Sequence, residues 1–157
     1  MNKHIKVYSA ILLFFLFAFT ACKKEAQDPG GTAVRAVAGE WWVQLDEDPG
    51  NYVNLSTYNS AANIPTEMWF DEGFYPTKTK VTVNTSDLTF SASKVNDPNS
   101  EVDVTISKGK ILQNAAKGPT SKAVTDSISY EVEYSDEPGT IYKFSGYRRT
   151  RFAEDDH

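Results

Sequence analysis

The sequence predicts an all-β protein, folded as an antiparallel up-and-down barrel of about eight strands. From Gly39 onward, apolar side chains recur with period two, and each apolar run ends in turn-forming residues. No stretch of about ten residues carries a helical period, so the crossover helices that parallel strands require are not expected. These observations favour a barrel, because closure also removes exposed sheet edges.

The strands follow one another from Trp41 to the end of the chain. In each, the apolar residues are expected to share one face and the polar residues the other. The pattern is clearest where Ile128, Tyr130, Val132 and Tyr134 alternate with Ser and Glu, and residues 141–147 supply a closing strand. The earlier apolar positions are, in chain order, Trp41, Val43, Leu45, Val53, Leu55, Trp69, Phe70, Val81, Val83, Leu88, Phe90, Ala92, Val102, Val104 and Ile106.

Short turns separate these strands. Their Asp, Asn, Pro and Gly residues supply the backbone angles and side-chain hydrogen bonds that turns require. Hairpin-length links of this kind join antiparallel neighbours. The clearest are Asp48-Pro49-Gly50-Asn51, Asn96-Asp97-Pro98-Asn99, Lys108-Gly109-Lys110 and Asp136-Glu137-Pro138-Gly139.

The first residues indicate export. A basic start with Lys3 and Lys6 precedes an apolar run over residues 10–19, which is too short to span a membrane as a helix. Thr20 and Ala21 then precede the single cysteine, Cys22. This arrangement resembles the lipobox of bacterial lipoproteins, although Phe19 stands where that motif usually has Leu. The alternatives are a cleaved signal that leaves a free thiol, and an uncleaved anchor.

The lipobox resemblance implies a division of the chain into three parts. Residues 1–21 are expected to be a signal peptide, residues 22–38 an acylated Cys22 followed by a flexible tether, and residues 39–157 the barrel domain. The lipid on Cys22 would hold the protein to the outer membrane of the cell envelope, facing the periplasm or the surface, while the barrel stays in water.

Composition excludes several kinds of site. The chain has 16 Lys and Arg against 21 Asp and Glu, a net charge of −5, which argues against a nucleic-acid partner. One Cys and two His, His4 and His157, are too few for a multi-His or Cys/His metal site. We expect neither a metal nor a cofactor. A Ser-His-Asp triad would need His157, which is expected to be frayed at the chain end.

Longer blocks of sequence resemble a known family. Gly39-Glu40-Trp41 has the Gly-x-Trp pattern that opens the first strand of lipocalins. With Thr57-Tyr58-Asn59-Ser60-Ala61-Ala62-Asn63, Thr125-Asp126-Ser127-Ile128 and Gly146-Tyr147-Arg148-Arg149-Thr150, this block resembles a Bacteroidetes family of lipoproteins described as lipid-binding putative hydrolases. The resemblance implies a lipocalin-like, or calycin, barrel. The middle motifs and the long C-terminal helix of true lipocalins are not recognised in the sequence.

Aromatic residues are the main candidates for a binding site. Flat apolar rings can bury a ligand while Tyr hydroxyls fix its polar end. The same rings could instead fill a packed barrel. The candidate lining residues are Trp69, Phe74, Tyr75, Phe90, Tyr130 and Tyr134. The calycin resemblance also implies that Gly39, Trp41 and Arg149 close one end of the barrel, with Arg149 across the Trp41 ring.

Carboxylates are the remaining candidates for catalysis. Paired acids can hydrolyse a glycoside without His, and the acid clusters Asp46-Glu47-Asp48, Asp71-Glu72 and Asp136-Glu137 are each placed in turns. The simpler interpretation is that these acids are solvated turn residues. Asp126-Ser127-Ile128 also resembles an O-glycosylation acceptor of Bacteroides species, or a strand start whose Asp caps a turn.

Three functions therefore remain open. The favoured one is a membrane-anchored barrel that binds a small apolar or amphipathic, lipid-like molecule without chemistry. The second is a hydrolase of a lipid or glycan that works through carboxylates. The third is a packed accessory subunit of a cell-envelope complex, with an unknown protein partner.

Overall fold

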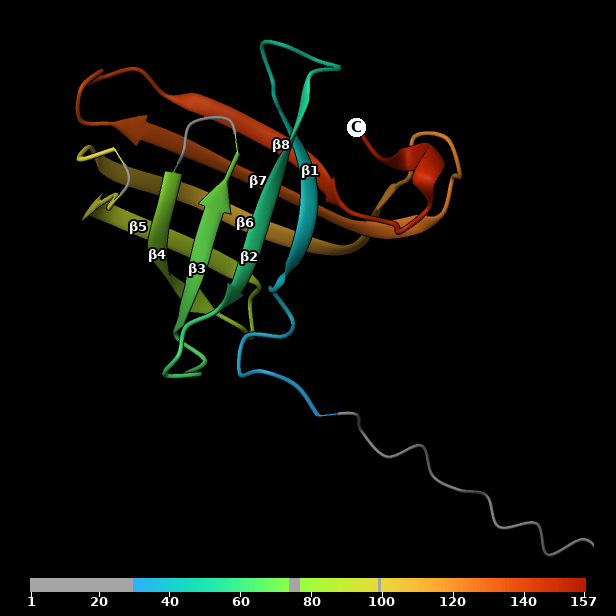
Figure 1. Ribbon diagram of the computed structural model, residues 1–157, viewed down its shortest axis with the longest axis horizontal. Helices are drawn as coiled ribbons and strands as arrows, with labels where there is room; N and C mark the ends of the chain where they lie inside the picture. The colour runs from blue at the N-terminus through green and yellow to red at the C-terminus, as the bar shows by residue number, and fades with distance from the viewer. Residues whose placement is uncertain (1–29, 74–76, 99) are drawn as a thin grey trace, which may run out of the picture. The chain divides into compact units, whose positions relative to one another are not determined.

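The computed structural model describes residues 30–73, 77–98 and 100–157. These residues form a closed antiparallel barrel in which each strand pairs with the next and β1 pairs with β8 (Figure 1). The predicted all-β, up-and-down barrel is confirmed. Its strands are β1 (Gly39–Leu45), β2 (Tyr52–Asn59), β3 (Glu67–Glu72), β4 (Thr77–Asn84), β5 (Thr89–Asn96), β6 (Asp103–Lys117), β7 (Val124–Tyr134) and β8 (Tyr142–Arg148).

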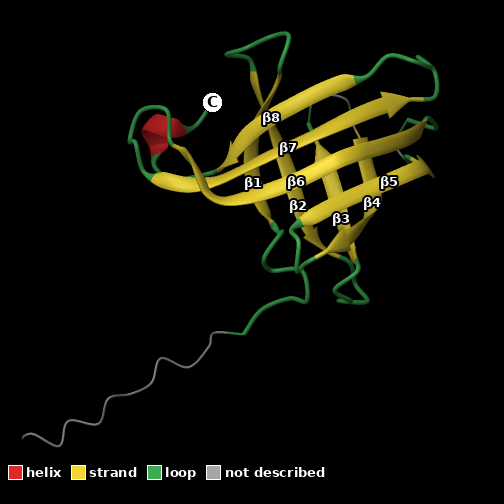
Figure 2. Cartoon of the chain, turned by 180° about the vertical axis from the view of Figure 1, so that it is seen from behind, coloured by secondary structure: helices red, strands yellow, loops and turns green. Residues whose placement is uncertain are grey.

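Helical structure in the described part is confined to η1 (Ala153–Asp155), a 3₁₀ turn (Figure 2). The same residues contain no apolar helix of membrane-spanning length.

The hydrophobic core lies inside the barrel. In β7, Ile128, Tyr130, Val132 and Tyr134 are buried as the alternation predicts, and the intervening residues are exposed or half-buried. The other strands contribute one face each for the same reason. The most completely buried apolar side chains include Trp41, Val43, Leu55, Met68, Phe70, Val81, Ile106, Ile111 and Ile128.

The two ends of the barrel differ. We call the end where β1 begins and β8 ends the capped end, because residues 32–38 lie beneath it (Figure 1). We call the opposite end, where β3 ends and β4 begins, the polar end. Because the strands run up and down in order, β5 and β7 also finish at the polar end.

The cap corrects one prediction. A flexible tether was expected up to residue 38, but Val34 and Val37 are completely buried in the core. The turn is fixed by the Ala33 amide, which donates to Asn63 Oδ1 at 2.8 Å, and by the Thr57 hydroxyl, which donates to the Val37 carbonyl at 2.7 Å. The folded unit begins at Gly31. Short apolar residues without periodicity gave no sequence signal for this packing.

The C-terminal segment packs beside the long β6–β7 hairpin (Figure 2). Asp155 is 1% exposed, and its carboxylate accepts hydrogen bonds from the Thr120 and Ser121 amides and from the Ser121 and Thr150 hydroxyls. Burial alone would raise the pKa of Asp155, but these hydrogen bonds outweigh it and hold the pKa below its ordinary value.

The possible glycosylation site lies in β7. Ser127 is half-buried and pairs with Tyr147, while Asp126 forms an ion pair with Arg148 at 3.0 Å. Glycosylation there stays a prediction.

Candidate functional site

A buried carboxyl group lies inside the barrel at its polar end. Met68, Phe70 and Glu72 occupy alternate positions of β3 and all point inward, so Glu72 is carried into the core by the same periodicity that buries its apolar neighbours. Its side chain is 1% exposed. A buried acid requires hydrogen-bonding partners, or it loses its charge.

Polar groups from two other strands surround Glu72. From β7, the Tyr130 hydroxyl donates to Glu72 Oε1, and Tyr134 lies close enough to lower the pKa of this carboxyl. Tyr134 and Thr77, at the start of β4, are joined through their hydroxyl oxygens at 3.2 Å. Together Glu72, Thr77, Thr79, Tyr130 and Tyr134 form a buried cluster that we call the polar cluster.

Two atoms of this cluster have no hydrogen-bond partner among the described residues. They are Glu72 Oε2 and Thr79 Oγ1, both fully buried. Thr79 pairs with Phe70 and Thr77 pairs with Glu72 in the β3–β4 ladder, so Thr79 lies diagonally across from Glu72 on the same inner face. Unpartnered buried polar atoms are rare, because each one costs about 1–3 kcal/mol.

Burial sets the protonation of the cluster. It raises the pKa of Glu72 to about 7, against the opposing effect of the nearby Tyr130 and Tyr134 hydroxyls. Burial, with the neighbouring Glu72 charge, also raises the pKa of Tyr130 well above 10, so its hydroxyl stays protonated near neutral pH. The carboxyl can therefore donate or accept a hydrogen bond near neutral pH.

Aromatic rings line the barrel between its two ends. The Phe70 and Tyr130 rings meet edge to face at 5.0 Å, and the Tyr130 and Phe144 rings stack at 5.2 Å. Phe90 contacts both Phe70 and Tyr130, with ring centroids 5.9 and 6.2 Å away. The result is an apolar wall with the Tyr130 hydroxyl directed to the polar end.

The predicted lining residues do not all lie in the barrel interior. Phe90, Tyr130 and Tyr134 lie in the interior, and whether they bind a ligand stays a prediction. Phe74 and Tyr75 lie outside the described residues. Trp69 was wrongly expected to line the interior, because its strand neighbours Met68 and Phe70 take the inward positions.

The Trp69 ring instead lies on the outer face of the barrel. The ammonium groups of Lys78 and Lys80 lie 5.9 and 5.4 Å from its centroid. Trp69 is thus part of a surface cation–π cluster and does not contribute to the interior.

Trp41 lies at the capped end, and its ring is covered by an arginine other than the one expected. The Trp41 indole donates to Thr57 Oγ1 at 2.9 Å, and the guanidinium carbon of Arg148 lies 4.3 Å from the Trp41 ring. Arg148, not Arg149, covers this ring because Arg148 is the β8 partner of Trp41, and directly paired residues share a face. Gly39, also expected at this closure, lies against the Arg148 side chain.

Arg149 lies on the outside and holds the C-terminal segment. It contacts Asp156 at 2.6 Å and Glu40 at 3.2 Å. His157, expected to be frayed, stacks on Tyr52 with ring centroids 4.1 Å apart, and its Nε2 lies 2.7 Å from the Tyr147 hydroxyl. The position of His157 is set by these long-range contacts, which local sequence does not reveal.

One of the three candidate acid clusters, Asp71-Glu72, does not lie in a turn as expected. Asp71 and Glu72 end β3, and adjacent strand residues point to opposite faces. Asp71 is outside, 3.1 Å from Lys78, so these two acids cannot face one substrate. The acids of residues 46–48 and 136–137 are exposed in turns, as expected.

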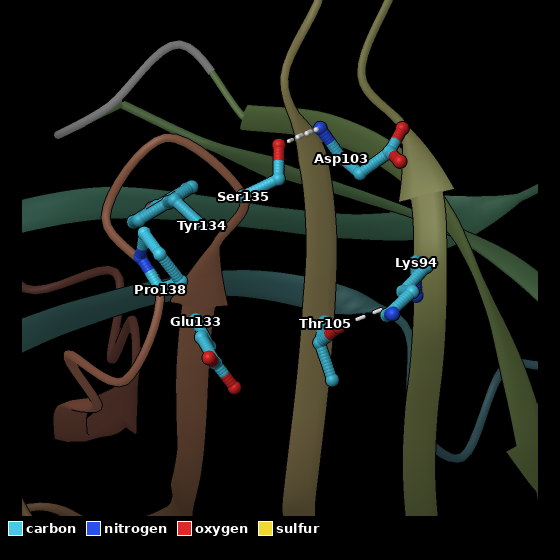
Figure 3. A pocket seen from close by; sticks show the side chains of 7 residues that line it. All are labelled: Lys94, Asp103, Thr105, Glu133, Tyr134, Ser135 and Pro138. Atoms are coloured by element: carbon cyan, nitrogen blue, oxygen red, sulfur yellow. Dashed lines mark hydrogen bonds between the residues drawn. The ribbon is translucent and has the colours of Figure 1, made fainter.

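A surface pocket of about 260 Å³ adjoins the polar end (Figure 3). It crosses the outer faces of β5, β6 and β7, where the Asp103 amide donates to Ser135 Oγ and the Lys94 amide to Thr105 Oγ1. Tyr134 belongs both to this pocket and, through its bond with Thr77, to the polar cluster. The residues around the pocket are Lys94, Asp103, Thr105, Glu133, Tyr134, Ser135 and Pro138.

Sequence reasoning named Tyr130 and Tyr134 as candidates but missed the other three members of the polar cluster. Glu72, Thr77 and Thr79 were not candidates for the interior, since the acid pair with Asp71 was read as a turn. The signal was present in the period of two that joins Met68, Phe70 and Glu72.

Comparison with known proteins agrees with this architecture. The family described as lipid-binding putative hydrolases matches residues 26–153, which includes all eight described strands. No curated protein matches the chain. Because the match spans most of the sequence, the chain belongs to the family of lipid-binding putative hydrolases.

Proposed function

We propose that the protein is a lipid-anchored binding protein whose barrel holds one small apolar or amphipathic molecule. The supporting observation is the interior itself. An aromatic wall leads to a single polar cluster that contains two buried polar atoms without partners in the described chain. An amphipathic molecule would place its chain against the wall and its polar end at Glu72 and Thr79. Apolar pockets with a few polar groups are the usual form of small-molecule sites.

A matched pair of substitutions tests binding inside the barrel. Ala92 is buried in β5, whereas Ser91, its neighbour, is exposed on the outer face. In Ala92→Phe, the added ring would occupy the interior, so binding of a neutral environment-sensitive dye should weaken by about tenfold or more. Ser91→Phe should bind like the wild type. Equal dye binding by both variants, with circular dichroism confirming that both are folded, would contradict an interior site.

The anchor is the second part of the proposal. It rests on the resemblance of residues 1–22 to a lipoprotein signal, and it places the barrel at the outer membrane on the periplasmic or outer side. Intact mass of the protein from bacterial membranes should show cleavage before Cys22 and an acylated cysteine. Cys22→Ala should remove the acyl mass and release the protein into the soluble fraction; an unmodified Cys22 would contradict the anchor.

Hydrolysis is a second candidate, favoured by one observation. A carboxyl with a pKa of about 7 is suited to act as a general acid or base. Glu72 would then activate water toward a bound ester. Turnover by the wild type that is lost in Glu72→Gln, with binding retained, would support it. Binding of the same esters without products would support the binding function alone.

A further inference from the structure

The buried polar groups of the barrel have an uneven charge balance. Among the described residues, the buried polar side chains include acids, such as Glu72, but no Lys, Arg or His. The titratable groups that contact Glu72 are Tyr130 and Tyr134, and neither supplies a positive charge. An anionic ligand head would therefore meet a carboxylate in a desolvated site without a neutralising cation. Two negative charges in contact inside a desolvated site repel each other strongly.

The hydrogen bonds of Glu72 indicate which kind of ligand group can bind beside it. Oε1 already accepts the Tyr130 hydroxyl, whereas Oε2 has no partner among the described residues. An ionised Oε2 only accepts hydrogen bonds, so its partner must be a donor. Thr79 Oγ1, also without a described partner, can accept from or donate to the same group.

Building on the proposed binding function, we infer that the barrel selects amphipathic molecules whose polar end is a non-anionic hydrogen-bond donor, a hydroxyl or an amine. That end donates to Glu72 Oε2 and hydrogen-bonds to Thr79 Oγ1, while the aliphatic part lies along Phe70, Phe90 and Phe144. Anionic heads such as carboxylates are rejected by Glu72.

A series of ligands with one chain and three heads tests this selection. Decanol, decylamine and decanoate are titrated by calorimetry into the purified protein at pH about 8.5 and about 5.5. At the higher pH, decanol or decylamine should bind about tenfold or more tighter than decanoate, as expected for a hydrogen bond to a charged group. The preference should shrink at the lower pH, where Glu72 is protonated and can donate to decanoate.

Two variants test whether Glu72 and Thr79 cause the preference among the three heads, and a third variant serves as control. Glu72→Gln keeps the shape and removes the charge, so its discrimination against decanoate should fall by about tenfold. Thr79→Val, an independent variant of similar shape, should weaken decanol binding by about threefold or more. Asp71→Asn removes a carboxylate from the outer face of the same strand and should leave the preference unchanged.

The outcomes separate this inference from the function on which it rests. If none of the three ligands binds, the binding function fails. If they bind with equal affinity, or decanoate binds best at the higher pH, the selection by Glu72 is wrong while the binding function stands. A preference that persists unchanged in both Glu72→Gln and Thr79→Val would also overturn it. Tighter binding of decylamine or of decanol identifies the head as cationic or neutral, and either supports the inference.

Discussion

Replacing Glu72 with Gln should make the protein more stable at alkaline pH. In the folded protein the pKa of Glu72 is raised from 4.5 to about 7, chiefly by burial. Between these pH values the folded state keeps a proton that the unfolded state releases, so wild-type stability decreases as the pH rises through this window. One pKa unit corresponds to about 1.4 kcal/mol, which gives a loss of about 3 kcal/mol that levels off above pH about 7.

Gln has no proton to release, so the variant should not show this loss. The difference in unfolding free energy between Glu72→Gln and the wild type should therefore move in favour of the variant by about 3 kcal/mol from pH about 4 to pH about 8. Urea denaturation followed by tryptophan fluorescence measures it. Asp71→Asn, which changes an exposed ion pair on the same strand, should alter stability by at most about 1 kcal/mol. A stability difference between Glu72→Gln and wild type that is the same at both pH values would refute the buried-carboxyl reasoning.

Four further substitutions test the arrangement of the barrel. Arg148→Ala should lower the unfolding free energy by about 1–2 kcal/mol, because it removes the cation over Trp41; unchanged urea denaturation would contradict that contact. Gly146→Ala should lower the unfolding free energy by about 1–3 kcal/mol, because the added methyl group would overlap the Trp42 backbone carbonyl. A urea denaturation midpoint equal to that of the wild type would contradict this close approach of β1 and β8. Trp69→Ala should leave dye binding unchanged, because the ring lies outside; weaker binding in titration would place it in the site. Asp155→Asn should lower the thermal midpoint at neutral pH, and the deficit should shrink as the pH falls below about 4, where the wild type loses the stability that its ionised Asp155 provides; a deficit independent of pH would contradict this role.

The strands could be predicted from local sequence because burial of one sheet face imposes a period of two. Ile128, Tyr130, Val132 and Tyr134 show this alternation, and their positions inside the barrel follow from it. Phe90 was placed correctly for the same reason. Where two aromatic residues are adjacent, as at Trp69 and Phe70, the flanking residues indicate which one points inward. Met68 shares the face of Phe70, whereas the acids Glu67 and Asp71 share the face of Trp69.

The features that sequence reasoning missed depend on long-range pairing. Whether Arg148 or Arg149 covers Trp41 is decided by the β1–β8 register, which joins residues more than a hundred positions apart. Val34 is buried only because the barrel offers an open end to cover. The burial of Glu72 was missed because an acid beside Asp71 is usually solvated, and this burial becomes understandable only beside Tyr130.

Native mass spectrometry of the purified protein, followed by extraction and identification of bound molecules, tests the central claim most directly. The account predicts a stoichiometric apolar or amphipathic passenger with a hydroxyl or amine end in the wild type, and its loss in Ala92→Phe but not in Ser91→Phe. A wild-type protein that carries no passenger and gains no mass when decanol or decylamine is added would contradict the claim that this barrel is a binding site.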